Sequence, residues 1–490
     1  MYLDLLKLAS PEAVVVVTVL AVLGAGLMGG VRASALCCAV AALGLATSIG
    51  AVLMLPDKAT LFHGMLVVTP LTSLFKIICL SLAFFTVILA RGDCSSRNPG
   101  EYLAMLLLAT VGLLLLVGSE ELLMIFIGLE LLGLSLYVMT AFDKTDTQSA
   151  EAGLKYFLFG STASAFTLFG ISFIYGMAGT TGLAAIGQRL TTGPVQPLLA
   201  VGIVMTLIGF AFKIAAAPFH LWAPDAYQGA PIPSAAFIAS GSKVASFVVL
   251  GKIVLVGFGP VHGSADWHAM VAGWSPVLAA LAAMSILLGN FVALAQSNVR
   301  RLLAYSAVAH AGYTLLGLVA GGRDGFSATL FYTTVYAITL LGAFGVVALV
   351  RGETGSDDLR NFSGLSSRSP LLAGCMSIFM LSLAGLPPLA GFFGKFYLFS
   401  VAMRAGDNHG LLWLVALALF GSLISLYYYL IVLKVIFLGQ SEAEGAFAPA
   451  NPIIHIDFLQ RVSLSGLGAL IIILGIAPTP LVSRILASLP

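Results

Sequence analysis

Charged side chains are scarce in this sequence. Asp, Glu, Lys and Arg together make up 9% of its 490 residues, whereas a soluble domain carries about a quarter. The formal net charge is only +2 and no run of like charge occurs, which argues against a nucleic-acid partner. Hydrophobic residues reach 59%, and apolar runs such as "VVVVTVLAVLGAGLMGG" (14–30) recur along the chain. Because about 20 apolar residues cross a hydrocarbon core of about 30 Å as a helix, we predict an all-α polytopic membrane protein embedded in the lipid bilayer.

The sequence also lacks the motifs of cofactor-binding and metal-binding proteins. Five cysteines are present, without metal-ligand spacing or a disulfide framework: Cys37, Cys38, Cys79, Cys94 and Cys375. The first two are adjacent within an apolar run, where small buried hydrophobic side chains are expected. No glycine-rich nucleotide loop follows a strand, and no CxxC cluster or flavin signature occurs. The sequence therefore shows no signature of a redox-cofactor site or a metal site.

Fourteen transmembrane helices are predicted from the apolar runs. Their expected ranges are 9–29, 33–55, 70–90, 101–118, 121–142, 154–177, 195–218, 231–256, 271–296, 300–320, 326–350, 370–401, 411–438 and 463–486. Lysine and arginine favour cytoplasmic loops. If both termini face outside, inside loops hold twelve of these residues, and outside segments, which include Lys252, hold seven. This bias predicts that both termini face away from the cytoplasm.

Five charged side chains fall within the predicted spans: Glu130, Lys76, Lys213, Lys243 and Lys395. A charge at the bilayer centre costs about 2.5–3.5 kcal/mol on insertion scales, and such residues usually mark ion or proton paths. Lys76 lies near the outer end of its span, where it is expected to extend to the interface, so that Lys76→Ala should be nearly neutral. Lys213 has the same option, whereas Glu130 and Lys243 lie near mid-span. A structural ion pair between Glu130 and Lys243 is the alternative to a functional role, which we favour because one acid faces three lysines.

Two histidines, His220 and His310, also lie in or beside predicted spans. A single histidine inside a membrane can serve only to satisfy a neighbouring carbonyl. Its side chain nevertheless titrates near neutral pH, which suits a proton relay. Both histidines are therefore candidates for such a relay.

Two of the spans contain helix breakers. One extends from about 195 to 223 and contains Pro218, and the other contains the stretch "AGLPPLAGFFGKF" directly before and including Lys395. Proline removes a backbone donor and clashes with the preceding turn. Discontinuous helices at corresponding places in two halves point to an inverted repeat with an ion site at the breaks.

The spacing of the spans predicts such a repeat. An N-terminal three-helix segment (1–100) is followed by five spans in 101–256, five more in 271–438, and a C-terminal helix in 439–490. An odd number of spans in the first unit inverts the second. Lys213 and Lys395 both lie beside the break in the fourth span of their units, and Glu130 and His310 occupy similar depths in the second. We therefore expect two inverted five-helix repeats, each with a broken helix.

With these residues in view, nearly the whole chain resembles the antiporter-like subunits of respiratory complex I, which are relatives of Mrp-type sodium–proton antiporters. The most specific segments are "FKIAAAPFHLWAPDAYQGAPIPSAAFIASGSK" (212–243), "RRLLAYSAVAHAGY" (300–313) and "GLPPLAGFFGKFYLF" (385–399). Among the paralogues, "PDAYQGAP" and a lysine at position 395 are similar to subunit N, the counterpart of mitochondrial subunit 2. The resemblance implies a charged axis formed by Glu130, Lys213, Lys243 and Lys395, with the two histidines as further relay candidates.

The resemblance further implies a proton-translocating, non-redox subunit of an NADH–quinone oxidoreductase. NADH, FMN, iron–sulfur clusters and quinone would then belong to partner subunits, and the partners would be other membrane subunits, both antiporter-like paralogues and small ones. The location would be the bacterial cytoplasmic (inner) membrane, with both termini on the periplasmic side. Two alternatives remain: a subunit of an Mrp-type sodium–proton antiporter, and a hydrogenase-associated membrane subunit.

Overall fold

The computed structural model describes residues 2–28, 30–91, 98–191, 196–405, 409–438 and 456–489. The first helices are α1 (Tyr2–Leu8), α2 (Ser10–Gly26), α3 (Gly30–Leu53), α4 (Pro70–Ala90), α5 (Pro99–Val117), α6 (Leu122–Thr140), α7 (Thr147–Ala178), α8 (Leu183–Leu190), α9 (Pro197–Lys213) and α10 (Trp222–Gly229). They are followed by α11 (Ile232–Phe237), α12 (Lys243–Lys252), α13 (Trp274–Ala293), α14 (Val299–Ala320), α15 (Gly322–Thr354), α16 (Leu365–Arg368), α17 (Pro370–Ala384), α18 (Ala390–Arg404), α19 (Leu412–Leu438), α20 (Phe458–Ile476) and α21 (Thr479–Ser488).

Short elements complete the fold. Strands β1 (Ala59–Leu61) and β2 (Leu66–Val68) form an antiparallel hairpin around the 3-10 turn η1 (Phe62–Gly64). Two further 3-10 turns are η4 (Gly259–Val261) and η5 (Leu359–Phe362). The π-helical segment η2 (Ile238–Ser242) joins α11 to α12, and the π-helical segment η3 (Ile253–Gly257) continues α12. Together these elements form one apolar helix.

The predicted all-helical membrane architecture is confirmed. Within the described residues, 11 helices are long and apolar enough to cross a membrane, and the shorter apolar helices α2, α9 and α17 lie in three further predicted spans. The prediction for the last span is wrong in one respect. The range 463–486 contains two helices, α20 and α21, because Pro478 and Pro480 interrupt the backbone hydrogen bonding between them. Helices α1 and α8 and the hairpin were not predicted.

Local sequence signals explain where the helices begin. Proline occupies the first turn of α4, α5, α9 and α17, where its missing N–H has no helical partner in any case. Other helices start at a capping side chain: Glu121 accepts from the N–H groups of Leu123 and Met124, and Asn298 accepts from that of Arg301. These signals fix the ends of the helices that carry the candidate residues.

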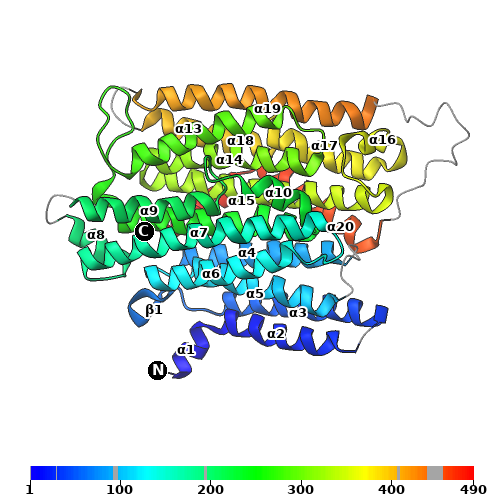
Figure 1. The fold of residues 1–490 in the computed structure, drawn as a ribbon, viewed down its shortest axis with the longest axis horizontal. Helices are drawn as coiled ribbons and strands as arrows, with labels where there is room; N and C mark the ends of the chain where they lie inside the picture. Colours follow the sequence, from blue (N-terminus) through cyan, green and yellow to red (C-terminus); the bar gives the residue numbers. More distant parts are fainter. Residues whose placement is uncertain are drawn as a thin grey trace, which may run out of the picture.

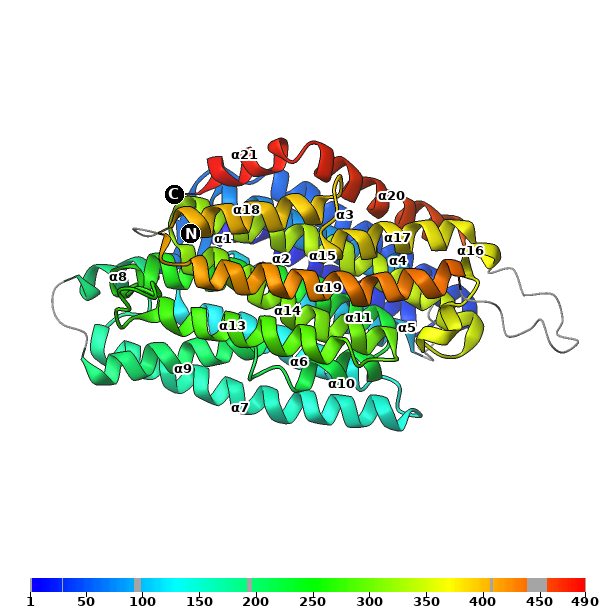
Figure 2. The same ribbon diagram turned by 90° about the horizontal axis from the view of Figure 1, so that it is seen from above.

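The long helices lie side by side with their axes in one general direction (Figure 1). Both ends of the chain lie at the same end of the bundle, near β1 and α8, and α16 lies at the opposite end (Figures 1 and 2). The two termini therefore share one side, as the sequence predicts. The assignment of that side to the periplasm stays a prediction.

Two sets of five helical elements follow one another along the chain. The first comprises α5, α6, α7, the pair α9 and α10, and the helix from α11 to η3; the second comprises α13, α14, α15, the pair α17 and α18, and α19. The interrupted helix is the fourth of each set. Helix α5 starts at the end of the bundle near α16, whereas α13 starts at the opposite end, so the second set is inverted relative to the first. The exact unit boundaries at 1–100, 101–256, 271–438 and 439–490 stay predictions.

Close glycine contacts attach the N-terminal helices to the first set. A Cβ atom added to Gly26 at the end of α2 would lie 2.9 Å from the Cα atom of Gly100 in α5. Small residues allow helix backbones to approach in this way, which favours packing between membrane helices. Helix α14 is deeply buried along most of its length, as is α15, and both occupy the middle of the bundle (Figure 2).

Candidate functional site

The first helix break lies directly after Lys213. Helix α9 ends at this residue and α10 begins at Trp222. The freed backbone groups find partners inside the protein: the N–H of Ala217 donates to Oγ of Ser285 at 2.8 Å, and Nε1 of Trp222 donates to the carbonyl of Phe212 at 3.0 Å. Non-helical backbone at membrane depth requires such internal partners. The predicted break is confirmed.

The second break lies between α17 and α18, before Lys395. Gly385 ends α17 with φ of 85°, and a Cβ atom at this position would lie 2.9 Å from Cδ of Lys395. Glycine is thus required both by the left-handed backbone and by the close approach of the lysine. The Lys395 ammonium donates to the exposed carbonyl of Ala384 at 3.1 Å, and Ser382 accepts from the N–H of Gly391 at 3.2 Å. The lysine side chain therefore helps to satisfy the broken backbone.

Glu130 and Lys213 face one another near the first break. Glu130 is half-buried on α6 and accepts a short hydrogen bond from the Ser164 hydroxyl on α7. Lys213 is buried and interacts electrostatically with Glu130. None of the ion pairs within 4.0 Å among the described residues joins these two groups. The carboxylate and the ammonium are therefore neighbours without direct pairing in this structure.

Lys243 has a neutral environment rather than a carboxylate partner. It follows the π-helical segment η2, a local widening of the helix that often occurs at functional sites. Its ammonium donates to the carbonyl of Ala307 at 2.7 Å and lies 5.3 Å from the ring centroid of Tyr336. A structural ion pair between Glu130 and Lys243, the alternative considered from the sequence, is absent among the described contacts.

His310 lies between the lysines of the two repeats. It is buried on α14, where it interacts electrostatically with both Lys243 and Lys395. Its Nδ1 atom is 2.8 Å from the Tyr332 hydroxyl, and its Nε2 atom is 3.1 Å from the Tyr429 hydroxyl. A histidine with a hydroxyl on each ring nitrogen has a donor or acceptor on both sides, which is the arrangement that a proton relay needs.

The polar contacts continue at Lys395. Its ammonium donates to Oγ of Ser422 at 2.9 Å and lies 5.2 Å from the ring centroid of Tyr313. The Tyr313 hydroxyl accepts from the Asn290 amide at 2.8 Å, and the same amide accepts at its oxygen from Tyr428 at 3.1 Å. Hydroxyl and amide groups thus surround the last lysine of the axis.

His220 lies apart from this chain of contacts. It is buried within the first break, its ring centroid is 6.3 Å from that of Tyr305, and its Nδ1 atom has no hydrogen-bond partner among the described residues. Among the described residues, no hydrogen bond or ring contact joins His220 to a candidate lysine. Its role as a relay stays a prediction.

Sequence reasoning missed most of the neutral members of the site. These are the side chains that contact the candidate residues or one another around them: Ser164, Asn290, Tyr313, Tyr332, Tyr336, Ser422, Tyr428 and Tyr429. One signal was available in the apolar run "FYTTVYAITL" of α15. Tyr332 and Tyr336 are four residues apart there, so they share one face of the helix.

The prediction for Lys76 is wrong, and Lys252 is buried as well. Lys76 does not extend to the interface: it is 1% exposed and pairs with Glu12 of α2 at 2.6 Å. Lys252, counted with the outside segments, is 3% exposed; it donates to the carbonyl of Val117 at 3.0 Å and lies 3.5 Å from Glu120. Depth along a single helix could not reveal these partners, because they come from other segments of the chain.

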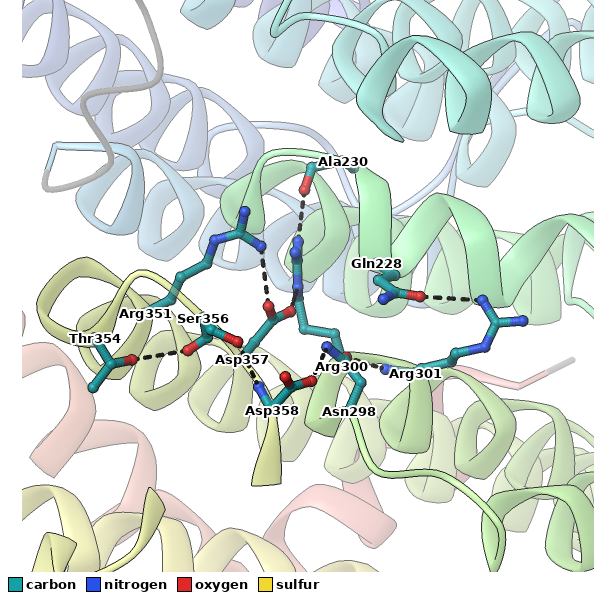
Figure 3. A network of polar contacts seen from close by, with 10 residues as sticks. All are labelled: Gln228, Ala230, Asn298, Arg300, Arg301, Arg351, Thr354, Ser356, Asp357 and Asp358. Carbon is teal, nitrogen blue, oxygen red and sulfur yellow. Dashed lines mark hydrogen bonds and ion pairs between the residues drawn. The ribbon is translucent and has the colours of Figure 1, made fainter. Parts of the chain in front are cut away.

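A network of ion pairs lies at the end of the bundle opposite the two termini, where α14 begins. Arg300, at the start of α14, pairs with the buried carboxylate of Asp357 and donates to the carbonyl of Ala230 at 2.8 Å; Arg351 also contacts Asp357, at 3.2 Å (Figure 3). Ala230 directly follows α10, so Arg300 links the first broken helix to the second repeat.

The motif "PDAYQGAP" takes part in the same network. Arg301 donates to Gln228 at 3.1 Å (Figure 3) and to Asp225 at 2.8 Å, and Asp225 also pairs with Lys155 of α7 at 2.8 Å. The motif therefore holds α7, α10 and α14 together at one end of the axis.

The described residues contain no group of three or more His, Cys, Asp or Glu side chains that could hold a metal ion. Cys37, Cys38, Cys79 and Cys375 are free and buried, and Cys94 lies outside the described residues.

Known proteins resemble this chain in sequence and in structure. The family described as "NADH:quinone oxidoreductase/Mrp antiporter, TM" matches residues 119–425, which is more than half of the chain. NADH-quinone oxidoreductase subunit N 2 of Acidobacterium capsulatum is 47% identical over 449 residues, covering 89% of each chain. Subunit N of Desulforamulus reducens is 40% identical over 427 residues, covering 87% of this chain and 85% of its own.

Solved structures agree with this grouping. A chain of respiratory complex I from Thermus thermophilus matches with a TM-score of 0.79 and 33% identity, covering 96% of this chain and 98% of its own. A chain of the Mrp complex from Dietzia shares the fold, with a TM-score of 0.84 at 22% identity over 99% of this chain and 97% of its own. The chain therefore belongs to the NADH:quinone oxidoreductase/Mrp antiporter family, and within it to the antiporter-like subunits of the subunit N type.

Proposed function

We propose that this chain is the subunit N of a bacterial NADH-quinone oxidoreductase and translocates protons across the inner membrane without redox chemistry of its own. The observation that carries the proposal is the series formed by the half-buried Glu130 and the buried groups Lys213, Lys243, His310 and Lys395, which is built around two broken helices. Buried ionisable residues of this kind in a membrane bundle serve ion or proton transfer by default. The names and sequence identities of the relatives support the same assignment.

The first step is a change in proton affinity at Lys213. A neighbouring carboxylate favours the charged form of a buried lysine, and removal of that carboxylate favours the neutral amine. Glu130 is close enough to interact with Lys213, but it accepts a hydrogen bond from Ser164 in place of a direct ion pair. A small shift of the carboxylate toward or away from the ammonium would therefore control whether Lys213 keeps its proton.

The later steps pass the proton along neutral partners. Lys243 transfers it through His310, whose ring nitrogens contact Tyr332 and Tyr429, toward Lys395. Lys395 releases it to the outer side. Since no redox group is expected in this chain, the energy comes from partner subunits that hold NADH, FMN, iron–sulfur clusters and quinone. Those partners include antiporter-like paralogues and small membrane subunits.

An Mrp-type antiporter subunit would need the same lysines and the same broken helices. Two relatives named subunit N are 47% and 40% identical to the chain, whereas the Mrp chain is 22% identical and supports the fold alone. The complex I assignment is therefore favoured over the antiporter and hydrogenase-associated alternatives.

The test is proton pumping by the assembled complex in proteoliposomes, with NADH and quinone as substrates. Lys213→Ala and Glu130→Ala should each strongly reduce the protons pumped per electron and leave assembly intact. Lys434→Ala is the control, because Lys434 is exposed near the end of α19. Wild-type pumping by either axis variant in an assembled complex would contradict the proposed switch.

A further inference from the structure

We infer that Gly475 and Arg323 are positioning residues for Lys395, because they hold the helix pair α20–α21 against the second helix break. The inference rests on the proposed function, in which Lys395 is the last group to hold the proton. The proposed function gives no role to Gly475, to Arg323 or to the last two helices.

The bend between α20 and α21 lies beside the second break. Helices α20 and α21 run along α17 and α18, with their bend next to the gap between α17 and α18 (Figure 2), and α20 contacts both of these helices. Gly475 is one residue before the end of α20, and Pro478 and Pro480 follow it at the bend. Two interruptions of helical backbone therefore lie against one another.

The contact at Gly475 is between backbone and backbone. A Cβ atom added to Gly475 would lie 2.1 Å from the carbonyl oxygen of Pro388 and 2.6 Å from the nitrogen of Ala390. Neither atom can turn away as a flexible side chain would, since both belong to the main chain. Ala390 is the first residue of α18, so any side chain at position 475 must displace either α20 or the start of α18.

The start of α18 in turn determines the contacts across the break. The Lys395 ammonium on α18 donates to the carbonyl of Ala384, the last residue of α17, at 3.1 Å, and the N–H of Gly391 donates to Oγ of Ser382 at 3.2 Å. A displacement of α18 by about 1 Å away from α17 would lengthen both contacts beyond hydrogen-bond range. Gly475 therefore acts on Lys395 through the backbone of the break, without touching the lysine.

Arg323 fixes the other end of the helix pair. It lies in the first turn of α15, and its guanidinium donates to the carbonyls of Leu486 at 3.2 Å and Leu489 at 3.0 Å, at the C-terminal end of α21. A cation at a helix C-terminus satisfies the last carbonyls and interacts favourably with the helix dipole. Because α15 is a deeply buried helix that also contacts α18, the helix pair is fixed to the core at one end and to the break at the other.

The pH dependence of pumping reports the position of Lys395. Helix α14 faces this lysine with Tyr313, whose ring centroid is 5.2 Å from the ammonium, and with His310, which interacts with it electrostatically. Helix α19 contributes the Ser422 hydroxyl, at 2.9 Å. These groups lie outside the break, so a displaced α18 changes their distances to the ammonium and the pH at which Lys395 titrates.

The experiment measures proton pumping by the assembled complex in proteoliposomes, with NADH and quinone as substrates, over a range of pH. The readout is the pH at which the pumping rate is half-maximal. Gly475→Ala introduces the clash at the break, and Arg323→Gln releases α21 without introducing a clash. Lys395→Met is included to test the proposed function separately.

Two glycine variants serve as controls. Gly466 is nine residues before Gly475 on α20, which places it on the opposite face of the helix, and a Cβ atom added there would meet nothing within 4 Å. Gly466→Ala therefore adds the same methyl group without strain. Gly26→Ala adds strain elsewhere, since its Cβ atom would lie 2.9 Å from the Cα atom of Gly100, between α2 and α5.

We expect Gly475→Ala to shift the half-maximal pH by at least about half a unit, which is the effect of losing one hydrogen bond to a titrating group. Arg323→Gln should produce a smaller shift, and both control variants should keep the wild-type value, whatever their total rate. If Gly475→Ala does not assemble, Arg323→Gln decides the question alone.

Three results would contradict this reasoning. An unchanged half-maximal pH in the assembled Gly475→Ala and Arg323→Gln complexes, with pumping abolished in Lys395→Met, would reject the positioning role and leave the proposed function standing. An equal shift in Gly26→Ala would also reject the positioning role, because strain anywhere in the bundle would then explain the effect. Normal pumping by Lys395→Met would reject the role of Lys395 in the proposed function itself.

Discussion

The ion pair between Lys76 and Glu12 predicts that replacing Lys76 destabilises the protein, whereas the sequence alone predicts a nearly neutral effect. Lys76 is on α4 and Glu12 is on α2, and their charged groups lie 2.6 Å apart with side-chain exposures of 1% and 8%. Beyond this contact, neither the carboxylate oxygens nor the ammonium has a hydrogen-bond partner among the described residues. Each charge is therefore compensated by the other.

The size of the expected loss of stability follows from this mutual compensation of charge. Removing one partner of a buried pair leaves an uncompensated charge and typically costs about 3–5 kcal/mol, whereas replacing both partners with neutral groups of similar size is often neutral. Lys76→Met and Glu12→Gln should each destabilise the protein by an amount in this range. The double variant should recover more than half of the loss, which gives a favourable coupling between the two sites.

The assay is unfolding of the purified protein in detergent, followed by the loss of its folded elution peak as denaturant is raised. The four proteins of the double-mutant cycle are compared at one pH and one ionic strength. If Lys76→Met is as stable as the wild type, the side chain reaches water and the buried pair does not form. If the double variant is no more stable than the single variants, the two losses are independent and the pairing argument fails.

Three further outcomes are expected. Lys395→Arg should lower proton pumping more than Lys395→Glu in proteoliposomes, because guanidinium is never deprotonated in proteins while a carboxyl group titrates; the reverse order would indicate a static cation. A cysteine at Arg360 should react with impermeant reagents only from the cytoplasm and one at Lys58 only from outside, and the opposite pattern would invert the predicted orientation. Asp357→Asn should destabilise the protein by about 3–5 kcal/mol, since two arginines lose their buried partner, whereas the exposed neighbour variant Asp358→Asn should stay within about 0.5 kcal/mol.

The fold could largely be predicted from the sequence because the bilayer imposes a strong rule. Every backbone polar group must be satisfied within the membrane, so long apolar runs become helices and helix breakers become visible exceptions. The breaks after Lys213 and before Lys395 were recognised for this reason. The predicted spans missed α8 and the β1–β2 hairpin, which lie at the end of the bundle that holds both termini, outside the apolar runs.

The charged part of the site was predictable for a related reason, since a lysine within an apolar run stands out. Its neutral part was not. Tyr332 and Tyr429 contact His310 from α15 and α19, and residues 97 positions apart in sequence give no local sign that they share a histidine. The same limitation explains the wrong prediction for Lys76, whose partner Glu12 lies on another helix.

The chemistry of their partners separates the buried lysines into two classes. Lys76 and Lys252 each lie against a glutamate, so each ammonium has a carboxylate beside it as a compensating charge. Lys243 and Lys395 have instead a backbone carbonyl and the face of a tyrosine ring, with a serine hydroxyl added at Lys395. These neutral partners orient the ammonium without compensating its full charge. We therefore assign the first class to the stability of the fold, and we propose that the second class, together with Lys213 beside Glu130, carries the proton.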